Sequence, residues 1–315
     1  MSQEEVLAGL SLPKRSLWAK FVRFIDSESF REYSETELDK IDWRRATPFV
    51  LLHLALFLVF FVGTSPVAYV VGLCSYLLRG FAITGFYHRY FSHKSFSTSR
   101  VFQFIFATVG CSALQRGPLW WCAHHRDHHS FADSEDDPHS PRYRGFWYSH
   151  MGWFMYPKHF KTRVERIPDF IKYPELRFLN RFDLVVPFMF AMLLFMVGVI
   201  LENVAPQWGT SGIQMVVWGF LVPTLFIFHV TAAVNSLCHR FGSRPYATKD
   251  SSRNNPLVAL FALGEGWHNN HHRLPYVVRQ GFRWYEYDFT YYVLRLMASV
   301  GLIWDLKEPP AKMPS

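Results

Sequence analysis

The sequence predicts an all-α membrane protein in which four transmembrane helices carry a cytosolic helical cap. Three observations lead to this fold class: long apolar stretches, a one-sided distribution of lysine and arginine, and three clusters of histidine. Half of the 315 residues are hydrophobic, and the mean hydropathy is +0.02. That value is too high for an ordinary soluble enzyme and too low for a protein that lies wholly within the bilayer.

Four stretches are long and apolar enough to cross a bilayer, which takes roughly 20 residues. The first two are joined by the tight turn Gly63–Pro66, and the last two by a short segment around Pro206–Gly209. The second stretch contains Arg79, whose long side chain we expect to reach the cytoplasmic interface. The expected spans are residues 46–62, 66–87, 184–201 and 212–234.

Lysine and arginine side chains predict the orientation of these helices. Eight precede the first span, 14 lie between the second and third, ten follow the fourth, and the hairpin tips carry none. Because such residues gather on the cytoplasmic side, both termini and the long middle loop are predicted to be cytoplasmic. The net charge of +8 then reflects topology and attraction to anionic lipid headgroups, and nucleic-acid binding is not expected.

The chain divides into a cytoplasmic N-terminal segment, residues 1–45, and a membrane domain, residues 46–315. Within the first segment, residues 17–25 combine an apolar stripe with two cations, which is typical of a helix lying at the membrane interface. We expect the cap to be formed by residues 88–181 and 235–315.

Two further segments of the cap have a predicted character. Residues 101–114 are apolar but too short to span a bilayer comfortably, so we expect a buried or re-entrant segment near the metal site that the histidine clusters predict below. Residues 281–305 are rich in aromatic side chains and predict an amphipathic helix that packs on the cap or the membrane surface, with contact to an electron donor as the alternative.

Three histidine clusters lie just outside apolar stretches. His88 and His93 follow the second span, and a five-residue step separates two side chains by about 140° on an α-helix. That pair could therefore reach two different metals. The other clusters share the spacing HxxHH, which places three imidazoles on one helical face. They are His125, His128 and His129, and His268, His271 and His272. Eight imidazoles exceed what one metal can hold and predict a two-metal centre.

A shorter pair, Asn235 and His239, lies at the cytoplasmic end of the fourth span. The two residues are four apart and share one helical face. His239 would be a ninth imidazole and Asn235 could hold a metal-bound water, although such a pair alone is more often a packing feature. Under the predicted topology all four groups lie on the cytoplasmic side, so they can converge on one site.

Imidazole suits zinc, copper, iron and nickel. The absence of a CxxC pair disfavours structural zinc. Nine neutral ligands around two divalent cations leave a large positive charge, so carboxylates are expected beside the ligands. The candidates are Asp127, Asp133, Asp136, Asp137 and Glu265.

On these residues the chain resembles the integral-membrane fatty acid desaturases of the stearoyl-CoA desaturase type. The matching segments are His88–His93 (HRYFSH), His125–His129 (HRDHH), Asn235–His239 (NSLCH) and Gly264–His272 (GEGWHNNHH). The resemblance covers roughly residues 45–305. It implies a di-iron centre in the cap, with Asn235 acting through water. The implied histidine ligands are His88, His93, His125, His128, His129, His239, His268, His271 and His272.

The resemblance also implies a dioxygen-dependent fatty acyl desaturase, using two external electrons to place a cis double bond, at the delta-nine position, in a saturated acyl chain. Iron can change oxidation state in this chemistry, which zinc cannot. An apolar tunnel would hold one C–C bond beside the metals. The aromatic residues that could line it, or simply belong to the core or membrane belt, are Trp120, Trp121, Phe146, Trp147 and Trp153.

The substrate could be an acyl-CoA or an acyl-lipid. Arg142 and Arg144 could contact a headgroup phosphate, or they could be topology charges. Animal acyl-CoA desaturases typically have an arginine two residues before the second histidine cluster, where this chain has Ala123, which weakens the case for a CoA-linked substrate.

Electrons are expected from a separate protein, such as a ferredoxin or a reductase system, because the chain has no room for a fused b-type cytochrome domain. A basic cytoplasmic surface would suit an acidic donor. The short N-terminus and the missing fusion domain favour a bacterial inner membrane as the setting. Two other functions stay open: a related membrane di-iron hydroxylase acting on alkanes or sterols, and a metal transporter, whose ligands should lie near the bilayer midplane.

Overall fold

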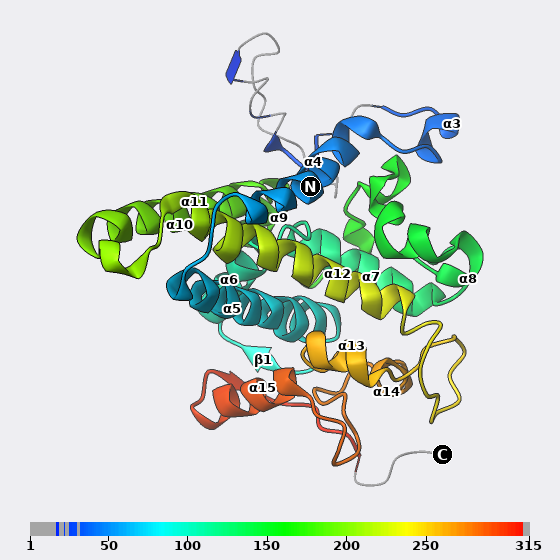
Figure 1. The fold of residues 1–315 in the computed structure, drawn as a ribbon. Helices are drawn as coiled ribbons and strands as arrows, with labels where there is room; N and C mark the ends of the chain where they lie inside the picture. The colour runs from blue at the N-terminus through cyan, green and yellow to red at the C-terminus, as the bar shows by residue number, and fades with distance from the viewer. Residues whose placement is uncertain (1–16, 19–21, 23–24, 30–31, 311–315) are drawn as a thin grey trace.

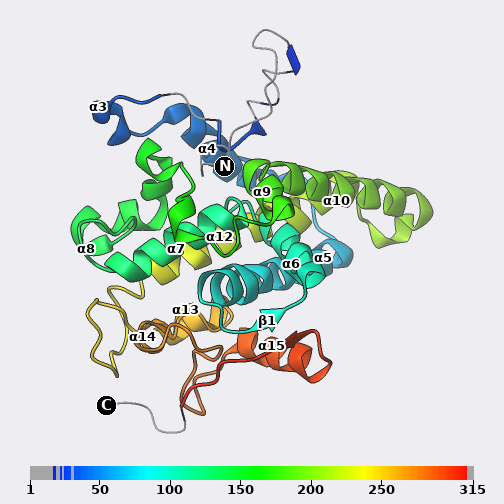
Figure 2. The ribbon, with the colours of Figure 1, turned by 180° about the vertical axis from the view of Figure 1, so that it is seen from behind.

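A computed structural model describes the chain except for residues 1–16, 19–21, 23–24, 30–31 and 311–315. The interfacial helix expected at residues 17–25 falls largely outside the described residues. The described part is mainly helical, as the sequence predicted, and its helices form one bundle with a cap at one end (Figure 1). The second view, Figure 2, shows α7 and α8 of the cap at the end of the bundle opposite the α10–α11 tip.

Within the described residues, four helices are long and apolar enough to cross a membrane, which confirms the four predicted spans. Most of them contain a change of helix type along their length. The spans are Glu35–Phe60, Pro66–Ser92, Val185–Val204 and Gly212–Ser236. Their component elements are α3 (Glu35–Leu38), α4 (Trp43–Ala55), η1 (Leu56–Phe60), α5 (Pro66–Phe81), η2 (Ala82–Ser92), α10 (Val185–Val204), α11 (Gly212–Val216), η8 (Val217–Leu221) and α12 (Val222–Ser236).

Glycine lets these spans approach each other closely. A Cβ atom at Gly72 on α5 would lie 2.6 Å from the carbonyl oxygen of Trp218, and one at Gly198 on α10 would lie 2.6 Å from that of Ser211. Such contacts are shorter than any side chain allows, so the small residues fix how α5 and α10 pack on the α11–α12 span.

The expectation that Arg79 reaches the cytoplasmic interface is wrong. Its side chain is 1% exposed and lies between spans. One terminal nitrogen of its guanidinium donates to the carbonyl oxygen of Ser112 over 2.6 Å and to the hydroxyl of Thr224 over 2.5 Å. The rings of Phe190 and Phe220 lie 5.3 and 5.2 Å from its guanidinium carbon. Arg79 therefore links α5 to α12 and to the end of α6. The oxygen atoms and aromatic rings around its guanidinium take the place of the water that it would have met at the membrane interface.

Short helices complete the cap and the sides of the bundle. Hydrophobic side chains on α6, α13 and α15 remain exposed, among them Val101, Leu257 and Leu296. Apolar faces of this kind are typical of helices that lie at a membrane interface. The elements are α6 (Arg100–Cys111), α7 (Pro118–Phe131), α8 (Pro141–Arg144), η3 (Tyr148–Gly152), η4 (Trp153–Met155), η5 (Pro157–His159), η6 (Val164–Arg166), α9 (Pro174–Arg181), η7 (Pro206–Trp208), α13 (Pro256–Phe261), α14 (His268–Arg273) and α15 (Phe289–Ser299).

Two segments differ from their predicted form. Residues 101–114 fall mostly on α6, which buries one face and leaves the other exposed, so the segment is not fully buried. The helix expected over residues 281–305 is limited to α15, and the chain beyond it forms strand β2 (Ile303–Trp304). Strand β2 pairs antiparallel with β1 (Ser97–Thr98), two residues against two. Asp288 explains the late start of α15, because its side chain caps the helix by accepting from the Tyr291 amide over 3.0 Å.

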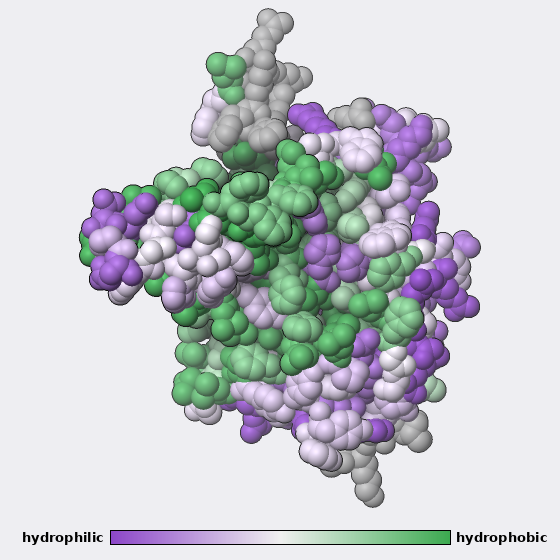
Figure 3. All heavy atoms as spheres, viewed as in Figure 1, coloured by the Kyte–Doolittle hydropathy of each residue, from purple (hydrophilic) through white to green (hydrophobic). Residues whose placement is uncertain are grey.

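The surface of the protein shows the same division into a membrane bundle and a cap. Figure 3 shows a hydrophobic band between the polar tip of α10 and α11 at left and the hydrophilic cap at right. The main buried core lies where the π-helical end of the second span meets the cap, and it includes Phe86, Phe91, Leu119 and Leu176. A rigid core at this boundary supports the side chains that leave η2 and α7.

Candidate metal centre

The nine predicted histidines come together in two adjacent groups. Within each group, the candidate ligand nitrogens all lie within 4.8 Å of one another. The groups adjoin, since the rings of His129 and His272, one from each, are 4.6 Å apart between centroids. One group has five members, His88, His93, His125, His129 and His271. The other has four, His128, His239, His268 and His272.

The π-helix η2 explains why His88 and His93 belong to one group. On an α-helix they would point about 140° apart, which left two metals open to them. In η2 the amide of His93 donates to the carbonyl oxygen of His88 over 3.2 Å, a bond between residues five apart. This bond places residue i+5 almost above residue i. The ring centroids of His88 and His93 are consequently 4.8 Å apart.

The HxxHH spacing divides each cluster between the groups. His125 and His129 are four residues apart on α7 and join the five-histidine group, while His128 joins the other. On α14 the assignment is mirrored, because His268 and His272 join the four-histidine group and His271 the other. Side chains at i and i+4 lie one above the other on a helix, and the residue at i+3 is turned slightly aside. Each helix therefore contributes to both groups.

Carboxylates hold the outer nitrogen of four of these rings. Nδ1 lies 3.0 Å from Asp137 in His128, 3.1 Å from Asp133 in His239 and 2.8 Å from Asp250 in His272. Nδ1 of His88 contacts Glu265. An ionised carboxylate can only accept, so Nδ1 carries the proton and Nε2 keeps its lone pair. The lone pairs of these rings then point into the two groups.

The ionisation states of the carboxylates and of five histidines agree with this arrangement, while for His128 the Asp137 carboxylate outweighs burial and raises the pKa. Burial alone would raise the pKa of the three aspartates, but the facing imidazoles lower their pKa values below the usual range. For Glu265, burial is outweighed by His88 and Arg89, which lower its pKa to about 2. Burial, followed by the neighbouring imidazoles, also holds several histidine pKa values well below their usual value, which favours the neutral, metal-binding ring. These are His93, His125, His129, His268 and His271.

The distances between Nε2 atoms fit a pair of metal ions. They are 2.7 Å for His93 and His125, 3.0 Å for His239 and His268, and 3.4 Å for His128 and His272. Two nitrogens bonded to one cation at about 2.1 Å and at right angles lie about 3 Å apart. In the last pair both Nδ1 protons are fixed by carboxylates, so two lone pairs face each other. A cation between them satisfies both.

A buried ion network holds the GEGW segment in place. Arg89, 1% exposed, donates to Glu265 and to Asp288, each over 2.9 Å. Gly264 has φ +114°, and a Cβ atom there would lie 2.5 Å from the Asp288 carboxylate. A Cβ at Gly266 would lie 2.1 Å from the Ala259 amide. Both glycines are therefore needed where the chain presents Glu265 to His88.

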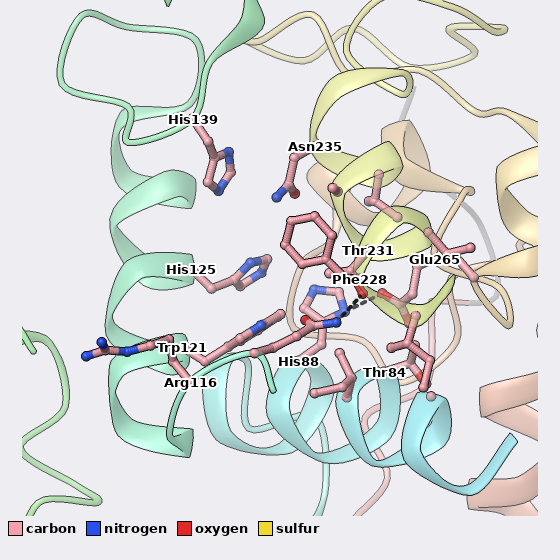
Figure 4. A pocket seen from close by; sticks show the side chains of 18 of the residues that line it. Thr84, His88, Arg116, Trp121, His125, His139, Phe228, Thr231, Asn235 and Glu265 are labelled. Carbon is pink, nitrogen blue, oxygen red and sulfur yellow. Dashed lines mark hydrogen bonds and ion pairs between the residues drawn. The ribbon is translucent and has the colours of Figure 1, made fainter. Parts of the chain in front are cut away.

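A pocket of about 160 Å³ lies beside the five-histidine group. In Figure 4, His88 and His125 line it from two sides, with Trp121, Phe228 and Thr84 around the same space. Trp121 stacks on His125 at 5.0 Å between ring centroids. Most of the wall is apolar or aromatic, and it is supplied mainly by the membrane spans and α7. Such a wall suits a hydrocarbon chain.

Asn235 extends from α12 into this pocket and faces His139 in Figure 4. His139 was not among the predicted ligands. Its ring lies 4.4 Å from that of His128, and its backbone amide donates to Asp137 over 3.1 Å. The sequence signal for His139 was the step Asp137-Pro138-His139, because Asp137 contacts both the ring of His128 and the backbone amide of His139.

The predicted substrate residues are only partly brought to the pocket. Trp121 lines it, together with Trp120 and Trp153. Arg142 and Arg144 are exposed on α8, and Trp147, 67% exposed, follows that helix. None of these three lines the pocket. Phe146 also lies outside its wall and stacks on His150, while Ala123 is fully buried in the core.

Three of the five carboxylates predicted from the sequence contact histidines. Asp133, Asp137 and Glu265 contact histidines as described, but Asp127 pairs with Arg163 and Arg166, and Asp136 is exposed. Asp250 was missed. It follows His239 by 11 residues in an irregular segment, and no spacing rule connects it with His272.

The fold and site together define a multi-span membrane protein with two adjoining histidine groups beside an apolar pocket. Residues 64–304 match the family model described as fatty acid desaturase. The chain belongs to the fatty acid desaturase family. Family membership makes it an oxidoreductase that acts on fatty acyl chains and a membrane protein.

Several relatives with assigned activities are similar over most of their length. An acyl-CoA 5-desaturase (AL21) of Anemone leveillei is 39% identical over 77% of this chain and 72% of its own. Delta-9 acyl-lipid desaturase 1 of Arabidopsis thaliana is 34% identical over 87% and 86%. The sn-1 stearoyl-lipid 9-desaturase of Synechocystis sp. is 34% identical over 94% and 90%.

Proposed function

We propose that this protein is a dioxygen-dependent acyl desaturase that introduces a cis double bond at the delta-nine position of a saturated acyl chain. The observation that carries the proposal is the pairing of two histidine groups with an apolar pocket at one wall of the five-histidine group. Two of the relatives above are named as delta-9 or 9-desaturases, which supports the position of the double bond.

The groups would hold two iron ions, the five histidines of one group on the first and the four of the other on the second, with Asn235 acting through water. Imidazole nitrogen suits iron, and the neutral rings described above are the form that binds. When bound, the iron pair supplies oxidation by dioxygen at an unactivated C–H bond, which side chains alone cannot do. Zinc and copper are the competing occupants for such donors.

The chain's own residues would position the substrate and exclude water. Apolar side chains such as Ile83, Ile227 and Leu263 line the pocket near His88 and His125 and would hold the methylene groups. Trp121, stacked on His125, would fix the chain against the centre. We keep Arg142, Arg144 and Trp147 as candidate contacts for the headgroup beyond the pocket, since all three are exposed near the cap surface.

The acyl chain would be carried by CoA or by a lipid, because relatives of both kinds are similar to this chain. Two electrons per double bond would come from a separate donor protein such as a ferredoxin or a reductase system. Both termini would be cytoplasmic, as the distribution of lysine and arginine predicts. We keep a bacterial inner membrane as the expected setting.

Expression in a host that lacks its own desaturase tests the proposal. We expect a new monounsaturated fatty acid, and derivatisation followed by mass spectrometry should locate its double bond at carbon nine. The His128→Ala variant is the matched control, since it removes one ligand nitrogen. A hydroxylated product without alkene would instead identify the related hydroxylase. Metal movement across vesicles without any lipid product would identify a transporter.

A further inference from the structure

Two loops flank helix α14 at the cap surface, and every exposed charged side chain in them is positive. Between Leu237 and Tyr285 the sequence holds seven lysine and arginine residues but only two carboxylates, Asp250 and Glu265. Both carboxylates are buried, at 8% and 6% exposure. Figures 1 and 2 show the loop after α12 and the segment after α14 beside α14, away from the α10–α11 tip.

Several of the cations are available to a partner. Arg240, Lys249 and Arg283 are exposed, and none of the three forms an ion pair within the part of the chain that the structure describes. The guanidinium of Arg283 donates to the neutral hydroxyl of Tyr285 over 2.6 Å. Trp284, between them in sequence, is 90% exposed. Tryptophan and arginine at an exposed tip are residue types that dominate binding energy at protein interfaces.

The two loops are attached directly to the helix that carries three candidate ligands. Asn269 and Asn270 lie between His268 and His271. The side chain of Asn269 accepts from the Tyr246 amide over 2.8 Å and donates to the Tyr246 carbonyl over 3.1 Å. That of Asn270 donates to Glu286 over 2.8 Å. Each asparagine therefore fastens one loop to α14.

Glu286 in turn shapes the tip that presents Trp284. Its carboxylate accepts from the amides of Phe282 and Arg283 over 2.7 and 2.9 Å, while it is held by Asn270. Glu286 is 4% exposed, so its negative charge is compensated by hydrogen bonds inside the loop and is not presented at the surface. The tip is thus fixed relative to the histidine groups, with its positive and aromatic side chains turned outward.

We propose that these two loops, residues 240–253 and 279–285, form the docking surface for an acidic electron-transfer protein that delivers its electrons at α14. This inference rests on the proposed function. One saturated acyl chain, one dioxygen, two electrons and two protons give one unsaturated chain and two waters, so the partner is oxidised by two electrons per product. A positive surface attracts an acidic partner and speeds its association.

Charge reversal in the loops tests the docking surface. The variant carries Lys249→Glu and Arg283→Glu, and its matched control carries Lys161→Glu and Lys172→Glu, exposed cations on the segment that includes η6 and leads to α9. All proteins are reconstituted in lipid nanodiscs and assayed with a reduced plant-type ferredoxin, an acidic [2Fe–2S] protein, and separately with dithionite and methyl viologen.

We expect the loop variant to raise the KM for ferredoxin roughly tenfold at low salt and to weaken its salt dependence. Product formed with the chemical reductant should stay within twofold of the wild type, and the control variant should behave like the wild type with both reductants. Trp284→Ala should raise the same KM without changing the chemically driven reaction.

An unchanged KM for ferredoxin in the loop variant overturns the proposal, as does an equal loss with both reductants. An effect that occurs only in nanodiscs of anionic lipid, and not in phosphatidylcholine, would assign the loops to lipid headgroups and overturn it too. Failure of the wild type with the chemical reductant would instead count against the proposed desaturase function, so the two failures are distinguishable.

Discussion

Four of the nine histidines turn one nitrogen toward the centre while a carboxylate holds their other nitrogen from outside. Each of Asp137, Asp133 and Asp250 fixes Nδ1 of one histidine, and all three of those histidines belong to the four-histidine group. In the five-histidine group, His88 alone contacts a carboxylate of the described residues, that of Glu265. The carboxylate charge therefore gathers around the four-histidine group, where fewer imidazoles are present to donate lone pairs to a cation.

Replacing His128 by alanine should remove one of four ligands from one group and none from the other. We expect bound iron to fall from about two toward one per chain and desaturation to be lost, since a three-histidine group binds a divalent cation less tightly. Inductively coupled plasma mass spectrometry of the purified protein measures the first effect. Full iron content together with full activity would contradict the assignment of His128.

Asp250 tests whether the outer carboxylates control metal binding. In Asp250→Ala, Nδ1 of His272 loses a partner at 2.8 Å and its proton position is no longer fixed. Loss of such a contact typically costs 10–100-fold in metal affinity, so iron retained after dialysis against a chelator should fall. Asp136→Ala is the control, because that carboxylate is exposed. Equal iron retention in both variants would rule out the role.

At the scale of elements, the packing of α6 against η2 holds His88 in place. Gly110 on α6 faces Tyr87, the residue before His88, and a Cβ atom there would lie 2.2 Å from the Tyr87 ring. Gly110→Ala should therefore push η2 away from α6. The cost should be about 1–3 kcal/mol, although alanine by itself favours a helix by up to about 1 kcal/mol.

The measurement is the midpoint of thermal unfolding in detergent, together with the iron retained. Gly110→Ala should lower both. Gly152→Ala is the matched control, since its Cβ would meet the nearest atom at 3.4 Å, an ordinary contact, and its backbone has no left-handed φ. A Gly110→Ala protein as stable as the control would show that η2 does not depend on this close approach.

The helices and the nine histidines were predictable because period and spacing are local properties of a sequence. The placement of His88 and His93 in one group was not, since it depends on η2 being π-helical, and residues 82–92 give no signal that separates π from α. Arg79 was misplaced for a related reason: its partners, Ser112 and Thr224, are 33 and 145 residues away. Asp250 and the β1–β2 pair likewise depend on contacts between distant segments.

At the scale of the whole molecule, one direction organises the protein. The polar tip at Pro206–Trp208 lies at one end of the bundle, the hydrophobic band follows, and the cap with its histidines and cations lies at the other end (Figure 3). Candidate ligands at the end of the spans differ from the midplane sites of transporters. A soluble electron donor can reach the centre only if the cap faces the compartment where that donor resides.

Cysteine labelling in intact cells tests this direction. In a Cys74→Ala background, whose other cysteines are buried, single cysteines are introduced at Gln207, exposed at the tip, and at Lys161, exposed on the cap. The charge distribution predicts that Gln207→Cys reacts with a membrane-impermeant maleimide from outside and Lys161→Cys only after lysis. The reverse pattern would place the cap outside the cell. It would then remove the cytoplasmic electron donor from the proposed function, even if the metal centre and its pocket were correctly assigned.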